Sequence, residues 1–406
     1  MNKVIISGWE IELPLVNNFS SFEKLLLNQE KIISKKYFSD DKLANYFKFQ
    51  VNPNVIQYKN KEINLFDKIR NLIDSGLQHA QITWNIINSS RVKIYLSGQG
   101  PRANFIDYQG FYDKNDAEDV KYSPNIKKLH ASSYAQDSLA NKLFKLYQLC
   151  FPPISIYCAS NSALMAVHIA RQEIKNKTID IAIILSWNDI LLQDLAFMDG
   201  QNMLVTEHAQ PLSKQSDGVL LSAGYSVLIL EEKEQVEKRK NKPLPIIHSS
   251  FFMQSNAEKN LGGTLFNFYT ISKLIINVLE LSSFSPLDIG AIFIHGNGSI
   301  ISDKAEVMAI SHVFKENLNV PIISYKGQIG YISNCSGVID LIIMANSLNK
   351  KRLIPSASHY PIDDAMDLNF LSDRKVLQYK NKPMLKIGLG MDGSLIAMIL
   401  ISDEEK

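Results

Sequence analysis

An α/β fold built from two similar halves is what this sequence predicts. Short apolar runs typical of buried strands alternate with longer stretches whose apolar residues recur at helical spacing. The same order of segments occurs twice, on either side of a charge-dense stretch at residues 231–242. Because strand–helix alternation is typical of α/β proteins, we expect one pseudo-duplicated body with halves at residues 1–240 and 241–406.

In the first half, turn residues separate the segments. Pro152-Pro153 ends a predicted helix, and the run at residues 179–186 is almost entirely apolar, as expected of a strand covered on both faces. The expected strands are residues 4–7, 92–97, 154–157, 179–186 and 225–230, and the expected helices are residues 67–87, 132–149 and 162–175.

The second half repeats this pattern. A glycine-rich turn follows its second strand, and another links its last two strands. The expected strands are residues 246–253, 289–294, 322–324, 385–388 and 395–401, and the expected helices are residues 267–281, 304–314 and 336–348.

Composition argues against several classes of function. Hydrophobic residues make up 46% and charged residues 21% of the chain, as in globular enzymes. The formal charge of +2, from 43 basic and 41 acidic residues, argues against a dedicated nucleic-acid binder. No apolar run approaches the ~18 residues of a membrane span, and the N-terminal run breaks at Glu10, so we expect no signal peptide. Three cysteines favour a reducing cytoplasm over a disulfide scaffold.

The first segment that could carry chemistry surrounds Cys158. A predicted strand ends, the cysteine occupies the turn, and a helix begins directly after it. A helix N-terminus favours the thiolate form of a cysteine, and small neighbours such as Ala159 and Ser160 leave room for an acyl group. Cys158 is therefore a candidate nucleophile, and the alternative is a buried packing residue.

Three further segments carry polar groups or glycines at strand ends. His295-Gly-Asn-Gly-Ser precedes Asp303 and Glu306, Lys326-Gly-Gln-Ile-Gly follows a short strand, and Gly388-Leu-Gly-Met-Asp-Gly links two strands. No helix follows the last segment, so it is not a dinucleotide-binding fingerprint. The sequence contains no CxxC or HExxH pair, and we expect no metal site.

Taken in order, these segments resemble the β-ketoacyl-acyl-carrier-protein synthase (ketosynthase) family. Cys158 stands where the family has its nucleophile in T-A-C-A/S-S. His295, with Asp303 and Glu306, resembles H-G-T-G-T-x-x-x-D-x-x-E, and Lys326 opens a segment similar to K-S-N-I-G-H. The resemblance implies catalytic roles for Cys158, His295 and Lys326, with the two acidic residues in support.

Two more segments extend the resemblance over nearly the whole chain. Pro211-Leu-Ser-Lys-Gln-Ser-Asp-Gly is similar to P-F-D-x-x-x-D-G, and the C-terminal glycine-rich turn is similar to G-F-G-G-T-N. The resemblance implies a thiolase-like five-layer αβαβα fold with two pseudo-duplicated halves. It also implies no cofactor of the chain's own, because substrates arrive on the phosphopantetheine of an acyl carrier protein.

The departures from the family lie in the motifs that the family uses for the condensation step. Tyr331 stands five positions after Lys326, where the family has its second catalytic histidine. The resemblance implies an oxyanion and gating loop in the C-terminal turn, at Leu389, Gly390 and Met391. In this loop Leu389 replaces the family's gating phenylalanine. Such changes resemble the chain-length-factor subunits of type II polyketide systems.

Three interpretations stay open. In the first, the chain is a chain-length-factor-like partner in a heterodimer with an intact ketosynthase, although retention of Cys158 is unusual for such a subunit. In the second, it is a self-sufficient synthase, active as a homodimer. The third is a non-elongating acyltransferase.

The second interpretation assigns a role to each residue. Cys158 accepts the acyl group, and the backbone N–H groups of Cys158 and Leu389 hold the oxyanion. His295 and Tyr331 stabilise the enolate, and Lys326 orients His295 through a pair with Glu306.

The resemblance yields three further structural expectations. Dimers of this fold form through a strand near the nucleophile, and we expect residues 179–186 to lie in that interface. His295 and Tyr331 are both expected to face the Cys158 sulfur. A basic patch, for which residues 350–352 are one candidate, is expected beside the entrance for an acidic carrier protein.

Overall fold

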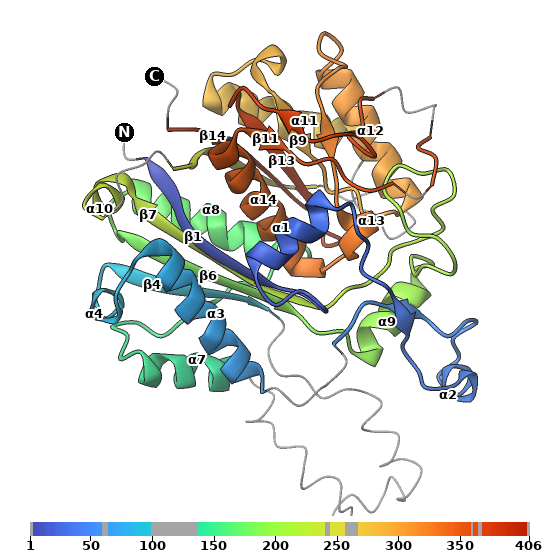
Figure 1. Cartoon of the computed structure of the whole chain (residues 1–406), viewed down its shortest axis with the longest axis horizontal. Coiled ribbons are helices and arrows are strands. Elements are labelled where there is room, and N and C mark those ends of the chain that lie inside the picture. Colours follow the sequence, from blue (N-terminus) through green and yellow to red (C-terminus); the bar gives the residue numbers. More distant parts are fainter. Residues whose placement is uncertain are drawn as a thin grey trace, which may run out of the picture.

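The computed structural model describes residues 3–58, 64–98, 136–239, 244–255, 267–358, 360–363 and 368–403. In this part of the chain the centre of the molecule is a mixed sheet of ten strands. Helices lie outside and between its two halves (Figure 1). The boundary predicted between residues 240 and 241 lies outside the described residues.

Five strands form the first half of the sheet. They are β1 (Val4–Glu12), β4 (Val92–Gly98), β5 (Ile154–Ser155), β6 (Ile181–Asn188) and β7 (Gly224–Glu232). Their order is β5-β4-β6-β7-β1. The first three are parallel, β7 is antiparallel to β6, and β1 is antiparallel to β7.

The second half has the same strand pattern. Its strands are β8 (Ile246–Gln254), β9 (Ala291–Phe293), β10 (Ile322–Ile323), β13 (Met384–Leu389) and β14 (Ser394–Ile401), in the order β10-β9-β13-β14-β8. Again three strands are parallel, the fourth is antiparallel to the third, and the fifth is antiparallel to the fourth. The predicted pseudo-duplication is therefore confirmed.

The two halves meet edge to edge between β1 and β8. Ile5 pairs with Ile246 in antiparallel register, and the Ile6 N–H donates to the Pro245 carbonyl at 2.9 Å. This short joint is the only ladder pairing between the two five-stranded sets among the described strands.

Helices make three layers around these two sets. The two outer layers are α3 (Leu65–Ala80) with α7 (Gln136–Leu146), and α11 (Phe268–Ser282) with α12 (Ile300–Val313); the middle layer is α8 (Ser162–Lys175) with α14 (Ser336–Lys350). α3 packs on β1 and β7, and α11 packs on β8 and β14. α8 and α14 contact each other and strands of both halves (Figure 1). The predicted α/β, five-layer αβαβα architecture is confirmed.

The sequence of α14 explains its central position. Every residue from 336 to 348 is buried, as expected of a helix that is covered on all sides. None of the described helices, α14 included, is long and apolar enough to cross a membrane.

Several elements differ from the sequence prediction. The helix expected at residues 67–87 is two helices, because Gln81 adopts a left-handed backbone (φ 59°) between α3 and α4 (Trp84–Ile87). Of the helix expected at residues 132–149, residues 132–135 lie outside the described residues, and the structure describes α7 over Gln136–Leu146. Elements without a prediction are short or little periodic: α1 (Phe19–Leu27), α2 (Asp41–Tyr46), α9 (Leu192–Gly200), α10 (Lys233–Glu237), α13 (Lys326–Ile329), β2 (Lys35–Lys36), β3 (Asn54–Val55), β11 (Arg352–Leu353) and β12 (Leu377–Gln378).

The interface predicted at residues 179–186 is wrong. β6, which forms most of this segment, pairs with β4 on one edge and β7 on the other, and all eight of its residues are buried within this chain. Its apolar character therefore reflects internal packing. Among the described strands, the edge strand of the first half is β5, which precedes Cys158.

Candidate active site

The predicted site residues come from both halves of the sheet. Cys158 follows β5, His295 follows β9, and Leu389 ends β13. All three therefore lie at the carboxyl ends of parallel strands, where α/β proteins commonly form their sites. Tyr331 bridges the halves, because its ring lies edge-on to His295, with centroids 5.6 Å apart, while its hydroxyl reaches Ser160.

Cys158 lies in a tight turn that precedes α8 by four residues. The next residue, Ala159, has a left-handed backbone (φ 41°), a conformation that alanine rarely adopts. The Cys158 N–H donates to Ser162 Oγ at 2.9 Å, and the Asn161 N–H donates to the Cys158 carbonyl at 2.8 Å. The expected oxyanion donor at Cys158 therefore already has an acceptor.

The surroundings of the Cys158 thiol disfavour its thiolate. Burial raises the pKa of the thiol, and the nearby Asp392 carboxylate raises it further, while a hydrogen bond with Ser394 opposes both. Ser394 Oγ in turn donates to Asp392 Oδ1 at 2.6 Å. Burial and the Asp392 carboxylate thus act against the ionised nucleophile that the helix N-terminus predicts.

Acidic residues of α12 hold the loop that carries His295. Glu306 accepts the N–H groups of His295 (2.7 Å) and Gly296 (2.9 Å), one on each carboxylate oxygen. Asp303 accepts those of Asn297 (3.0 Å) and Gly298 (3.2 Å) in the same way. The predicted supporting residues thus position the loop through its backbone.

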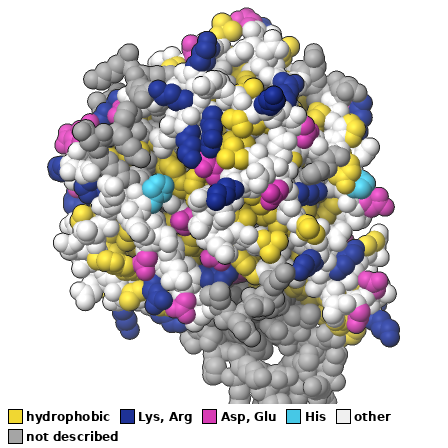
Figure 2. Space-filling model, viewed as in Figure 1, with side chains coloured by type: hydrophobic (Ala, Val, Ile, Leu, Met, Phe, Trp, Pro, Cys, Tyr) yellow, Lys and Arg dark blue, Asp and Glu magenta, His cyan; other side chains and the backbone are white. Residues whose placement is uncertain are grey.

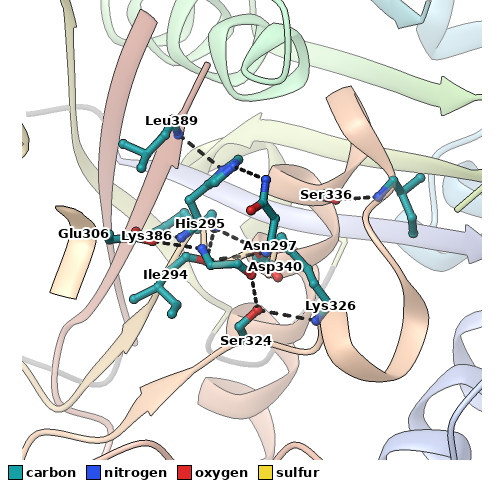
Figure 3. Close-up of polar contacts among 12 residues, drawn as sticks. Ile294, His295, Asn297, Glu306, Ser324, Lys326, Ser336, Asp340, Lys386 and Leu389 are labelled. Atoms are coloured by element: carbon teal, nitrogen blue, oxygen red, sulfur yellow. Dashed lines mark hydrogen bonds and ion pairs between the residues drawn. The ribbon is translucent and has the colours of Figure 1, made fainter. Parts of the chain in front are cut away.

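The predicted pair between Lys326 and Glu306 is wrong. Both oxygens of Glu306 are occupied by backbone donors, and Lys326 Nζ instead lies 3.1 Å from Asp340 Oδ2 of α14. Lys386, in the middle of β13, binds the same carboxylate oxygen at 2.6 Å. Figure 3 shows the two lysines converging on Asp340 behind the His295 loop.

The His295 ring is buried among donors and cations. The Leu389 N–H donates to Nδ1 at 3.5 Å, and Asn297 Nδ2 lies 3.3 Å from Nε2 (Figure 3). Asn297 Oδ1 accepts the Ser299 N–H, which turns the amide nitrogen toward His295. Burial lowers the pKa of His295 well below its usual value, and Lys326 and Lys386 lower it further. The imidazole is therefore neutral.

Tyr331 occupies the position of the missing second histidine. It is buried, and its hydroxyl donates to Ser160 Oγ at 2.5 Å. Burial raises the pKa of Tyr331 to about 12, so the phenol keeps its proton. The hydroxyl was expected to face the Cys158 sulfur, but its hydrogen bond goes to the serine two residues further along the chain.

The C-terminal turn places its three predicted residues close to the other groups. Leu389 contacts His295 through its N–H, Gly390 donates its N–H to the Ser394 carbonyl at 2.8 Å, and Met391 packs against the apolar cluster that contains Tyr331. Asn161 Nδ2 donates to the same Ser394 carbonyl at 2.9 Å, which ties this turn to the Cys158 turn.

Sequence reasoning missed Asp340 and Lys386. Asp340 is the one charged residue between residues 336 and 349, and Lys386 is the one charged residue between residues 384 and 391. A buried charge is rarely left unpaired. The two isolated charges of opposite sign could therefore have been predicted to form an ion pair. No cluster of three metal-ligating side chains occurs among the residues that the structure describes.

Two duplicated α/β sets that share one site, with a cysteine turn from one half and a histidine turn from the other, define a thiolase-like protein. The family of the "Beta-ketoacyl synthase, N-terminal domain" matches residues 1–236, and that of the "Beta-ketoacyl synthase, C-terminal domain" matches residues 250–360. The chain belongs to the β-ketoacyl synthase family.

Curated relatives are distant. A probable polyketide synthase 17 of Dictyostelium discoideum is 26% identical over 92% of this chain, which spans only 14% of that protein. The polyketide biosynthesis malonyl-ACP decarboxylase PksF of Bacillus subtilis (strain 168) is 24% identical over 78% of this chain and 75% of its own length.

Solved structures support the same fold. The ishigamide ketosynthase/chain length factor aligns with a TM-score of 0.83 at 15% identity, over 98% of this chain and 99% of that one. A type II polyketide ketosynthase in complex with its acyl-carrier protein aligns with a TM-score of 0.82 at 18% identity, over 98% and 99%.

Proposed function

We propose that this chain is a chain-length-factor-like subunit of carrier-protein-dependent polyketide or fatty acid assembly in the cytoplasm, paired with an intact ketosynthase. The observation that carries the proposal is Tyr331, which stands where the family has its second histidine and commits its hydroxyl to Ser160. A neutral phenol bound to a serine lacks the imidazole that the family uses in decarboxylation.

The oxyanion donors support the same proposal. The N–H of Cys158 donates to Ser162, and that of Leu389 donates to His295. Neither is free for a thioester oxygen, and one lost oxyanion donor slows acyl transfer by about 10²–10³-fold. The raised pKa of the Cys158 thiol adds to this deficit.

The edge at β5 supports a subunit interface beside Cys158. Tyr157 is 66% exposed and Phe151 is 44% exposed, and both lie next to this strand in the sequence. Large exposed apolar groups beside an edge strand favour contact with another subunit. The similarity to a ketosynthase/chain length factor structure is consistent with a heterodimer.

A carrier protein is the proposed substrate donor, and the chain requires no cofactor of its own. Figure 2 shows Lys and Arg side chains over α1 and α14. Of the candidate basic run, Lys350 and Arg352 pair with Glu23 at 2.7 and 2.8 Å, which reduces the charge available to a carrier protein. Carrier binding that weakens between low and physiological salt supports docking on basic residues.

The test is co-purification with candidate ketosynthases, followed by turnover assays with acyl and malonyl carrier proteins. We expect the single chain to be inert and the complex to be active. Cys158→Ala should leave the complex nearly unchanged, because the nucleophile in use belongs to the partner. Chain extension by the purified single chain contradicts the proposal.

Retention of Cys158 favours a second candidate, a self-sufficient synthase or a non-elongating acyltransferase. Cys158 is half-buried rather than fully buried. Under this alternative, Cys158→Ala abolishes acylation of the single chain, which intact mass spectrometry detects. Under the synthase alternative, Tyr331→His raises malonyl decarboxylation.

A further inference from the structure

Lys386 is a buried cation with no counterpart in the motifs discussed above. Its side chain is 1% exposed, within a strand whose every residue is buried. Its Nζ donates to Asp340 Oδ2 at 2.6 Å and to the carbonyl of Ile294 at 3.0 Å. This lysine therefore ties β13 and α14 to the residue directly before His295.

Lys386 and Lys326 share these acceptors. Lys326 Nζ lies 3.1 Å from the same oxygen of Asp340 and 3.5 Å from the Ile294 carbonyl. Two cations thus face one carboxylate beneath the His295 loop (Figure 3). Glu306 of α12 also faces this group, since it interacts electrostatically with Lys386.

We propose that Lys386 is a positioning residue for His295, which fixes the Ile294 carbonyl and places a second buried cation beneath the His295 loop. The inference rests on the proposed function only in taking His295 as the group that faces the acyl thioester. A neutral ring retains a lone pair for the N–H of Leu389 or the amide of Asn297, whereas an imidazolium retains none.

The charge of Lys386 is itself sensitive to pH. Burial lowers the pKa of Lys386 to about 8, Asp340 opposes this change, and Lys326 reinforces it. The Lys386 ammonium group therefore loses its proton just above neutral pH. The loss of this positive charge changes the electrostatic field at His295. Glu306, whose pKa burial raises to about 7, titrates below it and contacts the His295 N–H.

The experiment is NMR of ¹³C-labelled histidine in the full chain, with the His295 signal assigned by His295→Gln. We expect two transitions of this signal between pH 6 and 9.5, near 7 from Glu306 and near 8 from Lys386. Lys386→Met should lose the upper transition and move the lower one to higher pH, because the lysine no longer opposes the rise in the Glu306 pKa. The matched control, Lys380→Met, changes an exposed lysine on the segment before β13 and should keep both.

Lys386→Arg covers the case in which Lys386→Met does not fold. Arginine keeps its charge throughout this range, so the upper transition should again be absent. The loss of a cation beside the ring should also move protonation of His295 in Lys386→Met upward by about one pH unit. A wild-type signal without the upper transition, or the same transition in Lys386→Arg, overturns the proposal. Neither readout needs a partner subunit or turnover. The inference about Lys386 can therefore fail while the proposed function holds, and the reverse.

Discussion

The two sides of the site differ in how completely the protein surrounds them. On the His295 side, Glu306 and Asp303 are buried, and each binds two backbone N–H groups of the His295 loop. On the Cys158 side, the thiol is half-buried, the adjacent backbone is left-handed, and the exposed carboxylate of Asp392 acts on the thiol.

The difference distinguishes residues that hold the backbone of the site from residues that surround the cysteine. The His295 side retains the family's spacing because its side chains hold the backbone of a turn, which tolerates little change. Around Cys158, by contrast, Asp392 and the bridging Tyr331 stand where the family has other residues. Such a molecule keeps its fold while the residues around its cysteine change.

Removal of the carboxylate on the buried side should have the largest effect. Asp340→Ala leaves Lys326 and Lys386 without a counter-charge, and breaking a buried pair in this way costs about 3–5 kcal/mol. Urea unfolding measures the loss. The control, Asp67→Ala, breaks an exposed pair with Arg70 and should lower stability by about 1 kcal/mol or less. Equal losses in the two variants contradict the assignment of the buried cluster.

Next in size is the effect of Asp392 on the exposed side. Asp392→Asn removes a negative charge beside the thiol, so the pKa of Cys158 should fall while the part due to burial remains. A fall of about one unit makes alkylation by iodoacetamide at neutral pH roughly tenfold faster. Peptide mass spectrometry measures this against exposed Cys150 in the same molecule. An unchanged Cys158-to-Cys150 ratio argues that Asp392 does not act on the thiol.

A smaller effect is expected at the bridge between the two sides. Tyr331→Phe removes the hydrogen bond to Ser160 and should lower the free energy of unfolding by about 1 kcal/mol. Adding Ser160→Ala in a double-mutant cycle isolates the pair. Tyr269→Phe, at a residue 70% exposed, is the control and should be neutral. If the losses of the two variants are additive, Tyr331 and Ser160 do not interact, and the bridge between the two sides does not exist.

The smallest effect tests the backbone of the Cys158 turn. Ala159→Gly should stabilise the fold by about 0.5 kcal/mol, because glycine adopts a positive φ without steric penalty but loses more entropy on folding. Ala163→Gly, in the first turn of α8, should instead destabilise by about 0.5–1 kcal/mol. Destabilisation by both variants means that the turn is not strained.

The fold and the residues of the site were largely predictable, whereas their pairing was not. Periodicity revealed β14 and α14, since a strand or helix that is fully covered has a long apolar run. Resemblance identified Cys158, His295 and Tyr331. The sequence alone could not show that Glu306 binds backbone rather than Lys326, because that depends on how α12 and α14 approach the loop.

The interface error has a similar physical origin. An apolar run indicates that a strand is covered, but it does not tell whether the cover comes from the same chain or another one. β6 is covered by its own neighbours. The edge strand β5 is only two residues long and has no periodicity from which an exposed edge could be recognised.

The short joint between β1 and β8 has a consequence for refolding kinetics. The strands of the first half come from residues 4–232 and those of the second from residues 246–401, so each set can pair internally before the sets meet. The contact between Asn161 and Ser394 spans 233 positions and forms only after both sets have docked around α8 and α14. Closing such distant contacts is slow. During refolding, burial of Cys158 should therefore lag behind strand pairing within each half.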